Sequence, residues 1–217
     1  MNTANNVLLR SYKMTHDTGF APNPCGDVLS LATCKPGIRQ CALVGEWVAG
    51  FTSMTLCGAD VGDERLIYLM QVSQQILFEE YYEQYPDKRP ENCVCGDNIY
   101  RIKNGIYEQV PNRYHGADCC SNDTSCRYVL LSTEFYYFGC KAAIVPKECR
   151  PNLVNRARFG SKTTGRQAQV FIDWVKNVAA KNQQGIIGKP HNGPPPGSCS
   201  NTNGRCLARH NPYLHCP

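Results

Sequence analysis

The stretch Arg65–Val72 constrains the fold more than any other part of the chain, because Leu66–Met70 is nearly continuously apolar. A short run of this kind is typical of a strand at the centre of a sheet. The chain then passes into Leu77–Tyr85, where large apolar side chains lie on one helical face and glutamates on the other. Pro86 ends this pattern. The sequence therefore predicts a central strand followed closely by an amphipathic helix.

The remaining pattern predicts several more strands and one more long helix. Apolar side chains recur at helical spacing over Gln167–Ala180. Lys35–Gly37 reads as a turn that closes the second strand. Few helices, many strands and irregular loops favour an α+β fold on a mixed or barrel-like sheet with a few packed helices. The further strands are expected at Val7–Thr15, Leu29–Cys34, Trp47–Phe51, Asn98–Ile102, Tyr128–Ser132 and, after the aromatic segment Phe135–Gly139, around Ala142–Val145.

The domain organisation follows from where apolar periodicity stops. Residues 1–188 are expected to form one domain, and residues 189–217, which include three consecutive prolines, a poorly ordered tail. The chain has 217 residues and no apolar run of the roughly 18 residues that cross a bilayer. The start has no basic region typical of a secretory signal. We therefore expect a cytoplasmic protein that does not bind a membrane.

The charge is distributed unevenly along the chain. Residues 139–217 contain 12 Lys and Arg but only two acidic residues, Glu148 and Asp173. A one-sided positive field attracts polyanions. The same residues could instead form an ordinary solvated surface. If nucleic acid binds, Arg156, Arg158 and Lys162 are the expected phosphate contacts.

Several common signatures are absent. The chain has no G-x-G-x-x-G, no P-loop, no G-x-S-x-G and no H-E-x-x-H motif. It also lacks the zinc deaminase signature. These absences count against dinucleotide oxidoreductases, P-loop NTPases, common hydrolases and zinc deaminases.

What is present is an ordered series of short segments: Ser11–Tyr12, His16–Pro24, Leu31–Arg39, Val44–Gly50, Leu66–Tyr68, Phe78–Tyr82, Gly96–Tyr100, Val129–Ser132 running into Phe135–Gly139, and Ile172–Val175. This series resembles the nucleotide-modification-associated domain family, second type. The resemblance implies a role beside bacterial and phage systems that modify DNA bases. At the level of the fold, a second likeness is to PUA-like and EVE domains, which read modified bases.

The loop His16–Pro24 is the first candidate site. His16 can transfer a proton near neutral pH and Asp17 can orient it, so these two are the candidate catalytic residues. Phe20 offers a stacking face, and Asn23 can pair with a base edge. The alternative is that Asp17 and Asn23 cap turns while Phe20 fills the core.

Two further segments could bind a base. Asp97 and Asn98 present a carboxylate and an amide at the entry of a strand, and Tyr100 could stack on a ring. Tyr136 belongs to the aromatic run Phe135–Phe138, and such rings can form a stacking platform. Both segments have ordinary alternatives, since Asp-Asn is common in turns and half of an aromatic strand faces the core.

The 14 cysteines suggest a metal site or a set of buried thiols. Tetrahedral zinc takes four thiolates or imidazoles. Isolated cysteines such as Cys34, Cys41, Cys57 and Cys140 are expected to pack as small apolar residues. A second, tail-borne set would be Cys199, Cys206, His210, His215 and Cys216. The main candidate zinc ligands are Cys93, Cys95, His115, Cys119 and Cys126, with Cys120 as a sixth donor.

Three hypotheses for function remain open. The first is recognition or processing of modified bases or nucleotides, in DNA more than in RNA. The second is a nucleotide- or base-modifying enzyme, with His16 or His115 as the acid/base and Asp17 or Asp97 as its partner. The third is a zinc-stabilised interaction protein with no nucleic-acid role. The sequence leaves the oligomeric state open.

A thiol titration tests the expected compartment. The cytosol keeps thiols reduced, so protein from cytosolic expression, denatured without a reductant, should show most of its 14 cysteines as free thiols. Ten or more cysteines in disulfides would contradict an intracellular protein.

Overall fold

The apolar run expected at the centre of a sheet forms strand β4 (Leu66–Gln71) inside a six-stranded sheet. The computed structural model describes residues 7–58, 62–181 and 185–191. The neighbours β1/β3 and β9/β11 are parallel, and the other pairs are antiparallel. In spatial order the strands of this sheet are β10 (Ser161–Thr164), β1 (Leu8–Lys13), β3 (Trp47–Phe51), β4, β9 (Glu134–Tyr137) and β11 (Gly185–Ile186).

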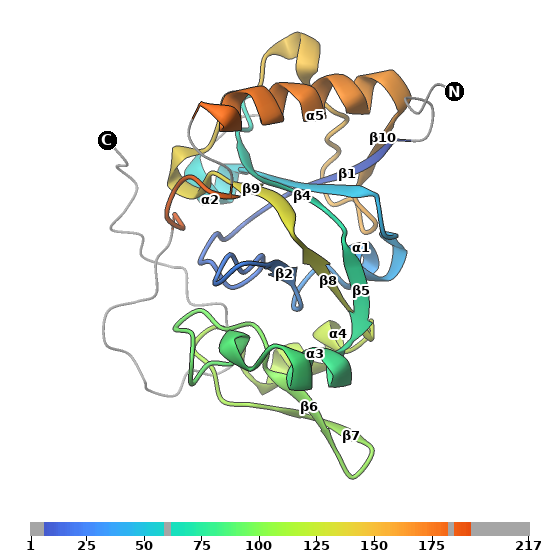
Figure 1. Cartoon of the computed structure of the whole chain (residues 1–217), viewed down its shortest axis with the longest axis vertical. Helices are drawn as coiled ribbons and strands as arrows, with labels where there is room; N and C mark the ends of the chain where they lie inside the picture. The colour runs from blue at the N-terminus through green and yellow to red at the C-terminus, as the bar shows by residue number, and fades with distance from the viewer. Residues whose placement is uncertain (1–6, 59–61, 182–184, 192–217) are drawn as a thin grey trace.

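A second, three-stranded antiparallel sheet continues from the first. Its order is β2 (Leu29–Leu31), β8 (Tyr128–Ser132) and β5 (Gln74–Leu77). The chain passes from β4 to β5 and from β8 to β9 through very short bends. At these bends the hydroxyls of Ser73 and Thr133 hydrogen-bond at 3.0 Å. Two bent strands therefore join the sheets, and the three-stranded sheet lies below the larger one in Figure 1.

The expected α+β fold with a mixed sheet is confirmed. The barrel-like form of that expectation is wrong for the residues that the structure describes, because their strands form open sheets and no closed barrel. Edge strands β10 and β11 are short, with four and two residues, and no strand bridges them. None of the described helices is long and apolar enough to cross a membrane.

Apolar side chains form three packed layers along the molecule. Helix α5 (Gly165–Ala180) covers one face of the large sheet, with Phe171, Ile172 and Val175 buried against it (Figure 1). The opposite face packs on the three-stranded sheet through residues such as Tyr68 and Leu31. A third cluster lies beneath the small sheet. Its buried members are Phe20, Ala32, Phe78, Tyr81, Ile99, Tyr100, Tyr114, Val129 and Leu131.

Short elements complete the fold around this third cluster and at the edges of the sheets. Both expected helices are confirmed, as α3 and α5. The remaining elements are α1 (Pro36–Cys41), α2 (Met54–Cys57), α3 (Phe78–Gln84), α4 (Cys120–Asp123), the hairpin β6 (Tyr100–Lys103) and β7 (Ile106–Gln109), and single 3₁₀ turns at Pro86–Lys88, Ala117–Cys119, Gly139–Lys141 and Lys147–Cys149.

Two local expectations are wrong. Ala142–Val145 is not a strand, because the chain turns at Gly139–Lys141 and only Ala143 bridges to Leu66. Lys35–Gly37 is not a simple turn, because Lys35 precedes helix α1 and Pro36 is its first residue. Proline suits the first position of a helix, where its missing N–H would have no partner within the helix.

Residues 189–191 pack against the domain. The Lys189 carbonyl accepts a hydrogen bond of 2.7 Å from the Cys140 amide. A Cβ at Gly139, whose φ is +51°, would lie 2.0 Å from that carbonyl oxygen. His191 hydrogen-bonds Asp17. The boundary expected after Gly188 stays a prediction, and we propose to move it to His191. The tail, with its second set of metal-ligand candidates, lies outside the described residues from position 192 onward.

Two truncations test this boundary. A chain that ends at Gly188 loses the His191 contact with a buried carboxylate, and a hydrogen bond to a charged group contributes about 1.5–3 kcal/mol. We expect its melting temperature to lie about 4 °C or more below that of a chain ending at His191. Equal melting temperatures for the two truncations would restore the boundary at Gly188.

Candidate active site

The candidate site begins where the chain leaves β2. Cys34 has a φ of +56°, and Lys35 has φ +42° and ψ +47°, so two consecutive non-glycine residues adopt the left-handed conformation. This conformation costs roughly 1–2 kcal/mol per residue and is concentrated at functional sites. The turn directs the chain into α1 and leaves Cys34 partly exposed.

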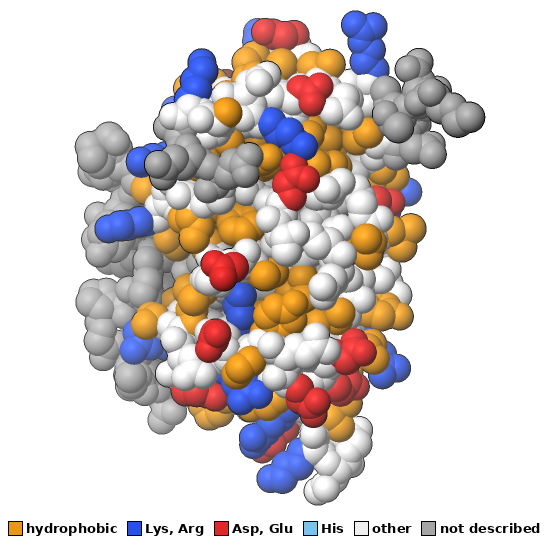
Figure 2. Space-filling model, in the orientation of Figure 1, with side chains coloured by type: hydrophobic (Ala, Val, Ile, Leu, Met, Phe, Trp, Pro, Cys, Tyr) orange, Lys and Arg blue, Asp and Glu red, His pale blue; other side chains and the backbone are white. Residues whose placement is uncertain are grey.

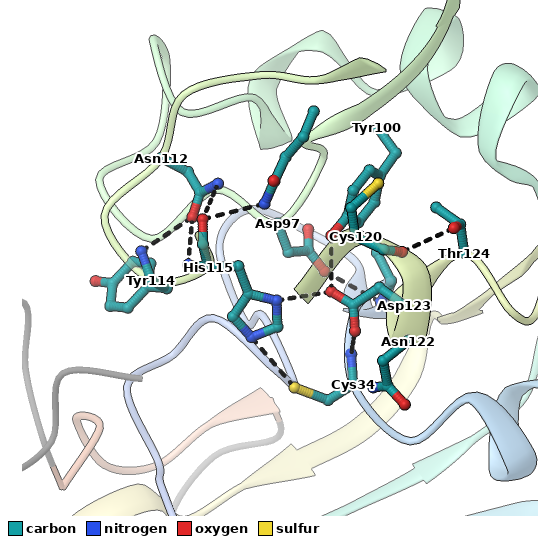
Figure 3. A network of polar contacts seen from close by, with 12 residues as sticks. Cys34, Asp97, Tyr100, Asn112, Tyr114, His115, Cys120, Asn122, Asp123 and Thr124 are labelled. Carbon is teal, nitrogen blue, oxygen red and sulfur yellow. Dashed lines mark hydrogen bonds and ion pairs between the residues drawn. The ribbon is translucent and has the colours of Figure 1, made fainter. Parts of the chain in front are cut away.

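Cys34 lies beside a histidine that is itself oriented by a carboxylate. The Cys34 Sγ is 3.4 Å from His115 Nε2, and His115 Nδ1 is 2.6 Å from Asp123 Oδ2 (Figure 3). His115 and Asp123 are buried, and the Asp123 side chain has no exposed surface. The three groups form a thiol–imidazole–carboxylate relay.

Asp123 is held by three donors. Besides His115, the Cys34 amide donates to Oδ1 at 2.8 Å and the Tyr100 hydroxyl to Oδ2 at 2.9 Å. Burial and the Asp123 charge raise the pKa of Tyr100 well above its usual value, so this hydroxyl stays protonated and donates. The carboxylate therefore fixes both the His115 ring and the Cys34 backbone.

The loop that carries His115 is also held in place. The Asn112 side chain accepts from the His115 amide at 2.7 Å and donates to the His115 carbonyl at 3.1 Å. The Phe20 ring contacts the imidazole edge-on, with 4.9 Å between the ring centroids, and it stacks on Tyr114 with a centroid distance of 4.8 Å. The imidazole is thus restricted in both position and rotation.

This hydrogen-bond pattern determines what each group can do. With Nδ1 donating to Asp123, His115 presents Nε2 to the thiol and can accept its proton. The same three side chains have donor atoms within 4.8 Å of one another, so their positions would also allow a metal ion. However, the Nδ1–Asp123 bond leaves only Sγ and Nε2 as ready ligands, which favours the relay over a metal centre.

Three predicted residues belong to this site: His115 itself, expected as a zinc ligand or as the acid/base, and Phe20 and Tyr100. Three others lie in different contacts. Phe20 contacts His115, and Tyr100 binds Asp123. Asp97, Asn98 and Asn23 connect segments of the fold, and their role in binding a base stays a prediction.

Their hydrogen bonds are internal, and Asn98 Oδ1 is buried with no partner among the described residues. Asp97 accepts from Ser30 Oγ at 2.8 Å and from the Tyr81 hydroxyl at 2.6 Å, and burial raises the pKa of its carboxyl to about 6. Lys88 Nζ donates to the Asn23 side-chain and main-chain oxygens, both at 3.0 Å. The Asn98 amide donates to carbonyls at the end of α3.

The side chains of Asp17 and His16 have different hydrogen-bond surroundings and do not bind each other. Asp17 is buried and binds the Tyr137 hydroxyl, the His191 amide at 3.1 Å and His191 Nδ1 at 2.7 Å. His16 does not pair with it, and its Nδ1 is buried with no hydrogen-bond partner among the described residues. Burial lowers the pKa of His16, so its neutral form is favoured. Their catalytic roles stay a prediction.

The remaining predicted base and phosphate contacts differ in burial, because the Tyr136 side chain is largely buried in the core under α5. Tyr136 lines an open depression of about 610 Å³ between the loop at Asp27 and strands β9 and β11. Arg156, Arg158 and Lys162 are exposed. On the face in Figure 2, Lys and Arg side chains are interspersed with Asp and Glu rather than gathered in one patch.

The expected zinc ligands do not converge on one point. His115 turns to Cys34, whereas the Cys93 and Cys95 sulfurs lie 3.6 Å apart in another contact. The hydrogen bond with Cys95 holds the pKa of the Cys93 thiol well below its usual range. Cys126 Sγ accepts from the Tyr128 amide. Within the described chain, the group of three metal-ligand side chains is Cys34, His115 and Asp123, and no zinc assignment follows from it.

Sequence reasoning missed Cys34 and Asp123. Cys34 was assigned to buried packing, and His115 was paired with Asp17 or Asp97 instead of Asp123. The available signal was local: Cys34 directly precedes Lys-Pro-Gly inside the motif Leu31–Arg39, and Asp123 follows His115 by eight residues.

The comparisons with known proteins give one match. The family model described as nucleotide modification associated domain 2 matches residues 7–193. This range includes every residue of the relay. No curated protein and no solved structure matches the chain.

The Asp17–His191 pair predicts a pH dependence of stability. Burial alone lowers the pKa of His191, but hydrogen bonds and charge from Asp17 and Cys57 raise it to about 9. An unfolded histidine titrates near 6.5. The pair therefore stabilises the fold fully below about pH 6.5, and this contribution is lost as the pH rises through about 9. In His191→Gln, the difference in unfolding free energy from wild type should shrink between pH 6.5 and 9.5. A difference that is constant across this range would contradict a charged pair.

Proposed function

The chain belongs to the nucleotide modification associated domain 2 family, and from this premise we propose that it is an enzyme that processes modified nucleotides with Cys34 as nucleophile. His115 is the general base and acid, and Asp123 orients it. Tyr100 and Phe20 are positioning residues.

The observation that carries the proposal is the Cys34–His115–Asp123 relay on a left-handed turn. Buried cysteines that only fill space need no hydrogen-bonded imidazole. Here the sulfur lies 3.4 Å from Nε2 and the opposite ring nitrogen is fixed by a carboxylate at 2.6 Å. This is the arrangement by which a base activates a nucleophile and is in turn oriented by a third group.

The proposed step balances without a redox partner. The Cys34 thiol gives its proton to His115 Nε2, and the sulfur attacks an electrophilic carbon of the substrate. The bond to the leaving group breaks, and the imidazolium returns the proton to that group. Water or a second nucleophile, deprotonated by the same imidazole, then displaces Cys34 and restores the thiol.

Processing is proposed in preference to recognition alone. The candidate reading groups Asp97, Asn98 and Asn23 have most of their hydrogen bonds within the protein. Recognition would then fall to residues around the relay, with Phe20 beside it. As finer proposals, the substrate belongs to DNA rather than RNA metabolism in a bacterial or phage system of the cytoplasm, and the exposed basic segment that includes Arg156 and Arg158 contacts phosphates when the substrate is a polymer.

A metal-dependent function is the second candidate, since Cys34, His115 and Asp123 could hold an ion by position. Zinc would accept sulfur and nitrogen ligands of this type. Metal content of the purified protein and its loss on Cys34→Ser distinguish the two candidates.

The nucleophile is tested through its reactivity with iodoacetamide, measured for each cysteine by peptide mass spectrometry at pH 6.5. Unassisted thiols are mostly protonated at this pH. We expect Cys34 to be alkylated about tenfold faster than Cys41, and His115→Ala to remove this advantage. Asp123→Asn should lower the rate as well, because the imidazole loses its fixed orientation.

Cys41→Ser is the matched control, since Cys41 lies at the end of α1. It should leave the rate at Cys34 unchanged. The proposal fails if Cys34 reacts no faster than Cys41 in the folded wild type, or if His115→Ala leaves that rate unaltered while circular dichroism shows a folded protein.

A further inference from the structure

Lys35 lies next to the nucleophile on the same left-handed turn. Its φ of +42° and ψ of +47° follow directly on the positive φ of Cys34. Its Nζ lies 4.8 Å from the centre of the Tyr12 ring, whose hydroxyl is fixed at 2.8 Å from that of Tyr68. One turn thus carries a thiol and an ammonium group on consecutive residues, close enough for the Cys34 charge to act on the pKa of Lys35.

Lys35 differs from the other buried cations in having no anionic or carbonyl partner. Arg10 pairs with Glu46 at 2.9 Å, Lys88 binds Asn23, and Arg39 binds backbone carbonyls. Among the residues that the structure describes, Lys35 forms no ion pair and its side chain no hydrogen bond, although it is half-buried.

A cation withdrawn from water without an anion is costly. Burial lowers the pKa of Lys35, and the nearby Cys34 opposes this effect. Tyr12 offers an aromatic face, which compensates a cation only in part. The position therefore favours an anionic group of a ligand that arrives beside Cys34.

We propose that Lys35 binds a phosphate of the nucleotide substrate and so places the reacting carbon at Cys34. This inference rests on the proposed function, since it assumes that Cys34 is the nucleophile. A lysine ammonium binds phosphate as a point charge. The substrate class is then a phosphorylated nucleotide or a nucleotide within a strand, and not a free base or nucleoside.

Two alkylating agents of nearly equal size measure the charge beside Cys34. Iodoacetate is an anion and iodoacetamide is neutral, so the ratio of their rates at Cys34 reports the local field. A change in thiol ionisation alters both rates together and cancels in the ratio. Removing one positive charge close to the thiol should lower the ratio about fivefold or more. We therefore expect this decrease in Lys35→Met and a ratio near wild type in Lys35→Arg.

Lys181→Met, which removes an exposed charge after α5, is the matched control and should leave the ratio unchanged. Trypsin does not cut before Pro36, so wild type and Lys35→Met give the same peptide, residues 14–39, and fragment ions separate Cys25 from Cys34. Met is unbranched like Lys, so the left-handed turn is no more strained in the variant.

Protection experiments then identify the anion. Thymidine 5′-monophosphate should slow iodoacetamide alkylation of Cys34 at concentrations where thymidine does not, and this difference should disappear in Lys35→Met. Protection by a single-stranded oligonucleotide and not by the monophosphate would assign the phosphate to a polymer. Equal protection by thymidine and its monophosphate, or a ratio unchanged in folded Lys35→Met, would overturn the inference. Slow, His115-independent alkylation of Cys34 in the wild type would instead overturn the proposed function itself.

Discussion

The buried guanidinium of Arg39 is the interaction on which the site depends. It has no exposed surface and donates from Nε to the Cys34 carbonyl at 2.9 Å, and from its two terminal nitrogens to the carbonyls of Cys126, Tyr128 and Asp123. The planar guanidinium has five donors in a fixed geometry, so one side chain can hold several segments in one arrangement. Arg39 thereby joins the turn at Cys34 to Asp123 at the end of α4.

This arrangement places the site at the junction of two cores. Tyr12 belongs to the core between the two sheets, and Phe20 to the core beneath the small sheet. Both rings lie near the turn at Cys34: Tyr12 contacts Lys35, and Phe20 contacts His115. Because packed cores resist small displacements, rings anchored on both sides keep the relay geometry fixed. The strain at two consecutive left-handed residues is then offset by contacts outside the turn.

The sequence predicted the long elements well because the spacing of their apolar residues indicates which side chains are buried. The apolar run of β4 and the stripe of α5 needed no tertiary information. The hairpin strand β7 and the edge strand β10 were missed, because neither has an apolar alternation that marks a strand and both depend on pairing with a neighbour. The relay could not be predicted for a related reason: Cys34 and Asp123 are 89 residues apart, and only the fold brings them together.

The polar residues of this chain fall into two groups. In one group the hydrogen-bonding atoms already have partners inside the protein, and in the other they do not. Asp97 looks like a site residue in the sequence, yet it has several partners inside the protein. A buried group satisfied in this way stabilises one arrangement and has little capacity left for a ligand. Cys34 and Lys35 are the reverse, since the thiol is partly exposed beside a base and the ammonium pairs with no described carboxylate. Free bonding capacity next to strained backbone, and not residue type alone, is the reason why we propose this turn as the site of the chemistry.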